Sequence, residues 1–207
     1  MESTGPLRAV RTWEEALPDH GAEQRAVHEA MLLTVGERGY DRASVREVAE
    51  RAGITQDRFH RRFGGKAACF AAAYGEAAEQ LGGVLLGACR GASGWREGFS
   101  TALAELLRSV AEQPLLSRAL LLEVRAARGE AWVEHQRLSE RLIEVLEGAR
   151  EQPGARPSSS PVTAGFVLGA IEETICVELA AGRAAEIERL HPDLTRLAFL
   201  QLFGEDE

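Results

Sequence analysis

Cationic side chains gather in one short segment of this sequence, SVREVAERAGITQDRFHRRF, residues 44–63. Arg58, His60, Arg61 and Arg62 crowd its end, and Gln56 precedes them. A guanidinium group can bond phosphate or the edge of guanine, and an amide side chain can pair with adenine. The segment therefore has the chemistry to bind nucleic acid, although a short arginine-rich helix can also be an ordinary solvated surface.

The charge of the rest of the chain is distributed unevenly. The 207 residues carry a formal net charge of -8. Residues 20–75 hold nine basic and seven acidic groups, whereas residues 76–207 hold 13 and 21, and residues 1–19 hold two and four. One basic segment in an acidic protein favours a single localised contact with a polyanion over a nonspecific coat on nucleic acid or membrane.

Two helices are expected before the cationic cluster. Apolar residues recur at helical spacing from Val27 to Val35, and Gly39 ends that pattern. Ser44 and Glu47 have the spacing of a capping box, and apolar residues follow at helical intervals. The spacing predicts a second helix of about eight residues that begins after Ser44.

A third helix carries the cluster itself. Gly53 ends the second helix, and Thr55 can cap the next one. Phe59 and Phe63 give this helix an apolar edge, and Arg61 falls on the opposite side. Two short helices joined by a turn form a helix-turn-helix, and the N-terminal tip of its second helix enters the major groove of DNA.

The stretch ERGYDRASVREVAERAGITQDRFHRRFGGKAACFAAAY resembles the DNA-binding domain of the TetR (tetracycline repressor-like) transcriptional regulators. The shared features are a first helix ending in Gly-Tyr, the pattern Ser-Val-x-x-Val-Ala-x-x-Ala-Gly-Ile-Thr, an aromatic-bearing helix, and a lysine after a short turn. The resemblance spans residues 27–74, about a quarter of the chain. It implies double-stranded DNA as a partner.

The resemblance also implies roles for individual residues. Ser44 and Lys66 would contact phosphate, the residues at 56–58 would face base edges, and those at 60–62 would contact backbone or bases. Thr55 stands with Gln56 at the tip of the helix. The expected DNA-binding residues are Ser44, Thr55, Gln56, Asp57, Arg58, His60, Arg61, Arg62 and Lys66.

Two residues depart from the family pattern. His60 replaces the tyrosine that commonly contacts phosphate, so DNA binding could strengthen as the pH falls, unless His60 is an uncoupled surface residue. Arg58 replaces a small residue and could add a guanine contact. The operator sequence of this protein therefore cannot be inferred from the operators of relatives.

The chain is expected to be all-α, with about nine helices. A flexible N-terminal extension (1–20) precedes a three-helix helix-turn-helix domain (21–75), and the resemblance implies an effector-binding and dimerisation bundle (76–207). Gly82-Gly83 and the glycines at 91–94 interrupt the pattern after the fourth helix, and Pro114 opens another apolar helix. A linker at 151–161 precedes the last two helices, which begin at Pro161 and near Pro192.

Two sets of residues are candidates for the functions of the bundle. A mostly apolar bundle suggests an apolar or amphipathic effector, although each candidate could equally serve the core or the surface. In the family, the last two helices pair with their copies in a second subunit, although packing within one chain would give the same apolar faces. The candidate effector-binding residues are Trp95, Phe99, Trp132, His135 and Phe166. The candidate dimer-interface residues are Gly165, Gly169, Leu194, Leu197 and Phe203.

The function that follows is a ligand-responsive DNA-binding regulator, expected to be a repressor that binds a palindromic operator as a homodimer. An architectural DNA-binding protein without an effector is the alternative. The five histidines are scattered, and no HExxH motif, nucleophile elbow or phosphate loop occurs, so neither enzymatic activity nor a cofactor or metal is expected. Three unpaired cysteines, no signal sequence and no membrane span predict a cytoplasmic protein.

Overall fold

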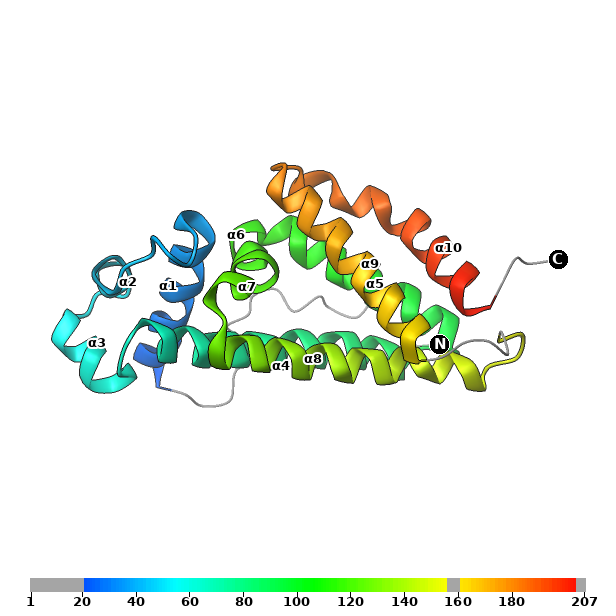
Figure 1. Ribbon diagram of the computed structural model, residues 1–207, viewed down its shortest axis with the longest axis horizontal. Helices are drawn as coiled ribbons and strands as arrows, with labels where there is room; N and C mark the ends of the chain where they lie inside the picture. Colours follow the sequence, from blue (N-terminus) through cyan, green and yellow to red (C-terminus); the bar gives the residue numbers. More distant parts are fainter. Residues whose placement is uncertain (1–20, 156–160, 204–207) are drawn as a thin grey trace, which may run out of the picture.

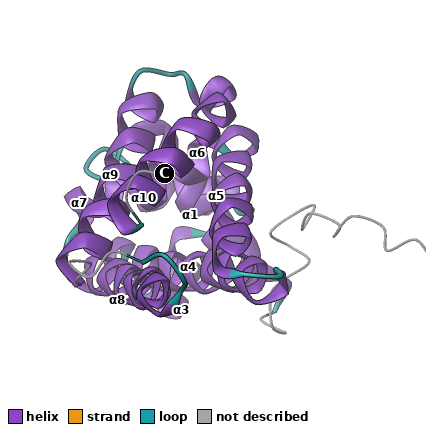
Figure 2. Cartoon of the chain, turned by 90° about the vertical axis from the view of Figure 1, so that its right-hand side faces the viewer, coloured by secondary structure: helices purple, strands orange, loops and turns teal. Residues whose placement is uncertain are grey.

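The computed structural model describes residues 21–155 and 161–203, and every regular element in these residues is helical. Figure 1 shows an elongated molecule, and Figure 2 shows its helices from one end. If residues 114–127 are counted as one element, the described residues form nine helices, which confirms the all-α prediction. The helices are α1 (Ala22–Arg38), α2 (Val45–Arg51), α3 (Gln56–Phe63), α4 (Lys66–Gly91), α5 (Trp95–Glu112), α6 (Pro114–Ser117), the π-helix η2 (Arg118–Glu123), α7 (Val124–Ala127), α8 (Gly129–Glu147), α9 (Pro161–Ala180) and α10 (His191–Leu202), with 3₁₀ turns η3 (Gly148–Glu151) and η4 (Ala184–Leu190).

The first three helices form the helix-turn-helix that the sequence predicts. Ser44 and Glu47 make both hydrogen bonds of a capping box at the start of α2. Gly53 lies in the turn with φ +69°, a conformation that suits glycine. The Thr55 hydroxyl oxygen accepts the backbone N–H of Arg58 and caps α3. Local capping therefore fixes both the start of α2 and the start of α3.

Helix α4 runs without a break from Lys66 to Gly91 and packs alongside α8 (Figure 1). The expected interruption at Gly82-Gly83 is therefore wrong. Glycine inside a helix costs only about 1 kcal/mol, which packing against neighbouring helices can offset. At Gly82 an added Cβ would lie 3.1 Å from Leu138, so the glycine lets α8 pack close to α4. The expected boundary after residue 75 falls inside this helix, which the two expected domains thus share.

The predicted apolar helix at Pro114 has an unexpected middle part. Its first turn, α6, begins with Pro114, but residues 118–123 then widen into the π-helix η2 before α7 completes the segment. A π-helix inside an α-helical segment is rare and is frequently found at functional sites. Residues 114–127 lie between α1 and the remainder of the bundle (Figure 1).

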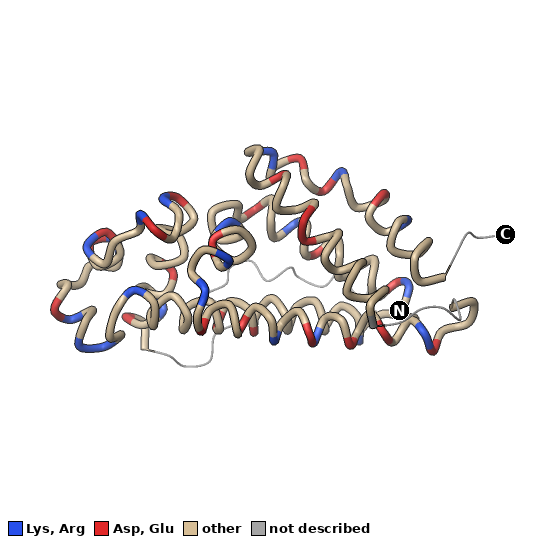
Figure 3. The backbone as a smooth tube through the Cα atoms, in the orientation of Figure 1, with Lys and Arg blue, Asp and Glu red and all other residues tan. Residues whose placement is uncertain are grey.

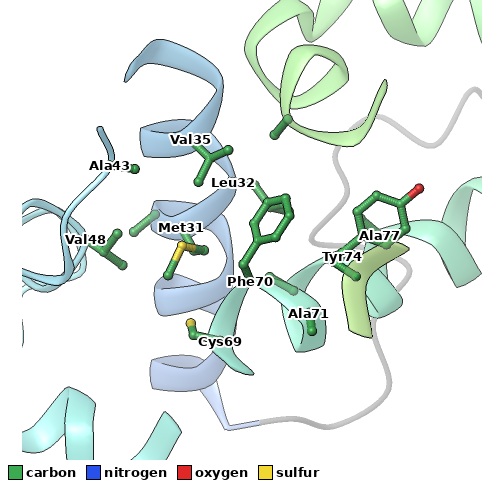
Figure 4. Close-up of a cluster of buried hydrophobic side chains, with 14 of the residues drawn as sticks. Met31, Leu32, Val35, Ala43, Val48, Cys69, Phe70, Ala71, Tyr74 and Ala77 are labelled. Carbon is green, nitrogen blue, oxygen red and sulfur yellow. The ribbon is translucent and has the colours of Figure 1, made fainter. Parts of the chain in front are cut away.

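Two apolar clusters hold the molecule together. One joins the helix-turn-helix to the bundle, since Met31, Val48 and Phe70 from the N-terminal helices share it with Leu120 and Leu138. Figure 4 shows part of this cluster, in which side chains of α1 face those of α4. The other cluster lies among α5, α8, α9, α10 and η4. The helix-turn-helix therefore has no separate core of its own among the described residues, because its buried side chains pack directly on bundle helices.

Helices α1 and α6 approach each other closely at Gly36 of α1. The carbonyl oxygen of Leu115 in α6 lies only 2.0 Å from the position that a Cβ on Gly36 would occupy. A side chain there would collide with the backbone of α6, so α1 and α6 can touch only if residue 36 is glycine.

We expect Gly36→Ala to lower the free energy of unfolding by about 2 to 3 kcal/mol, because the added methyl group must push α6 away from α1. Gly87→Ala in α4 is the matched control. It lies in a helix with no atom within 4 Å of its Cβ position, so we expect it to stabilise the protein by about 0.5 to 1 kcal/mol. Denaturant titration measures both, and equal effects of the two changes would contradict the proposed close contact.

Candidate DNA-binding and effector sites

The outer face of α3 is polar and cationic. Thr55, Gln56, Asp57, Arg58, His60, Arg61 and Arg62 are all exposed, whereas Phe59 is fully buried. Figure 3 shows Lys and Arg along α3 at one end of the elongated molecule. Burial of the aromatic edge orients the helix, and its opposite face presents guanidinium groups to solvent. This face has the shape and charge to meet the phosphates and base edges of DNA.

The three arginines of α3 are in different situations. Arg58 pairs with Glu23 of α1 at 2.5 Å, and Arg62 donates a hydrogen bond to the Gln24 side chain at 3.2 Å. Arg61 makes neither a hydrogen bond nor an ion pair within the described part of the chain. An exposed ion pair contributes at most about 1 kcal/mol, so DNA can displace it. Arg61 is therefore the α3 guanidinium that could bind a new partner without first breaking a bond within the described residues.

Ser44 is already engaged in capping α2. Its backbone N–H and its hydroxyl both donate to the Glu47 carboxylate, at 3.1 and 2.7 Å, and its oxygen accepts the Glu47 backbone N–H. These hydrogen bonds lower the pKa of Glu47, and Arg38 at 3.4 Å adds to the effect. The Ser44 hydroxyl must leave Glu47 to donate to phosphate. The Thr55 hydroxyl only accepts a bond from the Arg58 backbone, so its own proton can still be donated.

Lys66 differs most from expectation. Its ammonium group donates to the carbonyl oxygens of Tyr40 and Ala43 at 2.8 and 3.1 Å, and Asp41 O lies 3.5 Å away. It also lies 4.4 Å from the centre of the Tyr40 ring. Because an ammonium group has three donors, these contacts leave little capacity for phosphate. These contacts make Lys66 a clamp on the loop between α1 and α2, and its contact with phosphate stays a prediction.

A cavity of about 110 Å³ lies between α4, α5, α6 and η2 in the bundle. Its polar lining side chains are Gln80, Ser109, Gln113 and Ser117, and its other lining residues are alanine, leucine and valine. The Ser109 hydroxyl donates to the carbonyl of Glu105 within its own helix. The cavity is thus mainly apolar, with a few polar groups, as is typical of sites for small molecules.

None of the five candidate effector residues lines this cavity. Trp95 and Phe99 stack on each other near α10, with ring centres 5.5 Å apart. Trp132 packs against His135, which hydrogen-bonds the Tyr74 hydroxyl at 3.0 Å. Burial lowers the pKa of His135 and so favours its neutral form, and nearby Arg125 acts in the same direction. The last candidate, Phe166, is 63% exposed on α9. The five side chains thus occupy three separate places.

The π-helix beside the cavity is fastened to the helix-turn-helix at both ends. At its start, the Arg118 guanidinium donates to the Gly36 carbonyl at 3.2 Å and to the Leu179 carbonyl at 3.1 Å. At its end, the Glu123 carboxylate accepts the backbone N–H of Tyr40 at 2.8 Å. The same short segment therefore lines the cavity, through Leu120 and Leu121, and holds the C-terminal end of α1.

The candidate dimer residues divide into two groups. Gly169 and Leu197 are exposed, Leu197 at 50%, and Gly165 is half-buried. Leu194 and Phe203 are buried within the chain, at 8% and 9% exposure, where they pack in the cluster of α5, α9 and α10. A side chain already buried in its own chain has little surface left for a second copy. The expected interface role of Leu194 and Phe203 is therefore corrected to a role in the core.

Several of the residues at these sites could not be found from sequence patterns. Glu23, Gln24, Arg118 and Glu123 act through contacts with residues 35 or more positions away, and no motif marks them. Gln80 is a single amide in an otherwise apolar helix face, and its candidate role is apparent only from its place in the cavity wall.

Comparison with family models identifies the N-terminal domain. Residues 34–73, which run from α1 through the helix-turn-helix into α4, match the model described as bacterial regulatory proteins, tetR family. A comparison with curated proteins finds no match. The helix-turn-helix fold and this match define a DNA-binding domain of the kind found in these regulators. The N-terminal domain of the chain therefore belongs to the TetR family.

Solved structures share the fold of most of the chain, well beyond the N-terminal domain. The fatty acid degradation regulator FadR from Bacillus halodurans has a TM-score of 0.75 and 16% identity, over 84% of this chain and 96% of that one. FadR from Bacillus subtilis, solved in complex with stearoyl-CoA, has a TM-score of 0.76 and 15% identity, over 88% and 99%. The ketosteroid transcriptional regulator KstR2 of Mycobacterium tuberculosis has a TM-score of 0.66 and 14% identity, over 90% and 97%. At these identities the similarity establishes the fold alone.

The described residues also bear on the membrane question. No helix among them is both long enough and apolar enough to cross a membrane.

We expect Lys66→Met to destabilise the protein by about 2 kcal/mol, because the loop carbonyls lose a charged donor. The matched control is Arg42→Met, an exposed cation in the same loop that bonds one carbonyl, at Arg38, with an expected effect below about 0.5 kcal/mol. Thermal unfolding measures both. If the Lys66 variant instead keeps normal stability and the salt dependence of its DNA binding falls by about one phosphate contact, Lys66 contacts phosphate and does not clamp the loop.

Proposed function

We propose that this protein is a transcriptional repressor that binds a palindromic operator as a homodimer and is released by a small-molecule effector in the bundle. The observation that carries the proposal is the exposed cationic face of α3, held outward by the burial of Phe59. Blocking a promoter requires only occupancy of DNA, which this face can provide. The residues that we propose as the DNA contacts are Ser44, Thr55, Gln56, Asp57, Arg58, His60, Arg61, Arg62 and Lys66.

An exposed apolar face on α9 supports the homodimer. Val162, Phe166 and Val177 are 80%, 63% and 51% exposed, and at roughly 100° per residue they lie within about 60° of one another. Gly169 is exposed on the same side, and Leu197 of α10 is a further exposed apolar residue. Apolar faces of this kind mark interaction sites. A two-fold dimer would also place two α3 helices about one DNA turn apart, which suits a palindrome.

The effector would act through the π-helix η2. A molecule in the cavity touches Leu120 and Leu121, and the ends of the same segment hold α1 through Arg118 and Glu123. A shift of η2 would therefore move α1, against which α2 packs. A ligand changes DNA affinity only to the extent that it binds the two arrangements differently. Repression is relieved if the arrangement that fits the ligand separates the two α3 helices from their DNA spacing.

Selection from a pool of randomised duplexes tests the DNA-binding proposal. We expect the wild-type protein to enrich a palindrome with a dimer's spacing, and Arg61→Ala to lose affinity for it by about 5- to 100-fold, because one phosphate or guanine contact is removed. Arg137→Ala, an exposed arginine on α8, should leave the affinity unchanged. Enrichment of no sequence, even at low salt, would refute the regulator proposal, and binding without sequence preference would favour an architectural protein.

Sedimentation equilibrium tests the α9 interface. We expect Phe166→Glu to raise the dimer dissociation constant at least tenfold, because a carboxylate would be buried between the two subunits without a partner. Val133→Glu is the control, since Val133 is 43% exposed on α8, away from the proposed face. An unchanged dimer in the Phe166 variant would place the subunit contact elsewhere.

A further inference from the structure

One polar group in the cavity wall has no hydrogen-bond partner among the described residues. The side-chain Nε2 of Gln80 in α4 is buried, and no described residue accepts a hydrogen bond from it. An amide donor that folding leaves unpaired costs about 1 to 3 kcal/mol. Gln80 is also one of the residues that line the cavity. An acceptor atom supplied from inside the cavity would remove this cost.

The rest of the wall limits what that acceptor can belong to. Asp, Glu, Lys and Arg are all missing from the described lining residues, so a charged molecule would lose its hydration without gaining an ionic partner. Leu81, Leu106, Val110 and Leu120 supply apolar surface instead. The volume of about 110 Å³ is comparable to the cavity of about 150 Å³ that binds benzene in a well-studied engineered protein.

We propose that the cavity binds an uncharged, mainly apolar molecule of single-ring size that carries one acceptor oxygen, and that Gln80 Nε2 donates a hydrogen bond to this oxygen. Gln80 is thus the residue that determines ligand specificity. This inference rests on the proposed effector function and names the chemical class of the effector. Ketones, esters and amides of this size belong to the class, whereas carboxylates and plain hydrocarbons do not.

Three probes of nearly equal shape test the proposal. Each is titrated into the full chain without DNA, and binding is measured by calorimetry or by protein NMR. Acetophenone offers a neutral acceptor oxygen, α-methylstyrene replaces that C=O by C=CH₂, and benzoate carries a charge. We expect acetophenone to bind about tenfold tighter than α-methylstyrene, which corresponds to one net hydrogen bond, and benzoate to bind more weakly than acetophenone.

Variants locate the donor. Gln80→Leu should bind acetophenone and α-methylstyrene equally, whereas Gln113→Leu in the same wall and Gln136→Leu on the exposed face of α8 should keep the tenfold preference. Any one of four results would overturn the proposal. The wild type could bind the two neutral probes equally, fail to bind acetophenone, or bind benzoate as tightly as acetophenone, or the Gln113 variant could lose the preference. The comparison of acetophenone with α-methylstyrene on the wild-type protein tests the proposal even if a variant fails to fold.

The failure of this inference can be told apart from failure of the proposed function. The titration contains no DNA, and the duplex selection contains no ligand. Selective DNA binding together with no probe preference would reject only the role of Gln80. Probe preference without any selected DNA sequence would leave the cavity chemistry standing and reject the regulator.

Discussion

The contact between α1 and residues 114–127 is the constraint on which the rest of the structure depends. Gly36 lets the Leu115 carbonyl approach α1, and Arg118 and Glu123 then hold the end of that helix with charged hydrogen bonds. Charge-assisted bonds of this kind are about twice as strong as neutral ones. Because the helix-turn-helix shares its apolar cluster with bundle residues, it cannot reorient without disturbing the segment that lines the cavity. We propose that a ligand in the cavity alters the position of the helix-turn-helix relative to the bundle.

The exposed position of the α3 arginines also follows from how the helix packs. Phe59 anchors the helix in the shared cluster and leaves its arginines outside, where Glu23 holds Arg58 and Gln24 holds Arg62. These exposed pairs are weak enough for phosphate or a base edge to replace them. Lys66 keeps the loop before α2 in place, so contacts within the chain itself support the cationic face.

Local sequence patterns made the helix-turn-helix predictable, whereas contacts between distant segments leave no such pattern in the sequence. The caps at Ser44 and Thr55 depend on residues three positions away, so sequence spacing alone identified them. The Lys66 clamp, the η2 widening and the cavity depend on segments that meet only in the folded chain. Helical periodicity also cannot distinguish a face buried in the same chain from one buried in a second copy, which is why Leu194 was assigned to the wrong surface. The break expected at Gly82 is absent because packing of α4 against its neighbours outweighs the low helix propensity of glycine.

Hydrogen exchange with and without the selected operator duplex tests the central claim, that the DNA-binding face and the cavity are connected through α1 and η2. By linkage, DNA that fixes α1 must change the stability of whatever holds α1. We expect the amides of residues 118–123 to gain protection when the operator binds, and a duplex of scrambled sequence to have a smaller effect. Changes confined to residues 21–75, with none in residues 118–123, would contradict the connection.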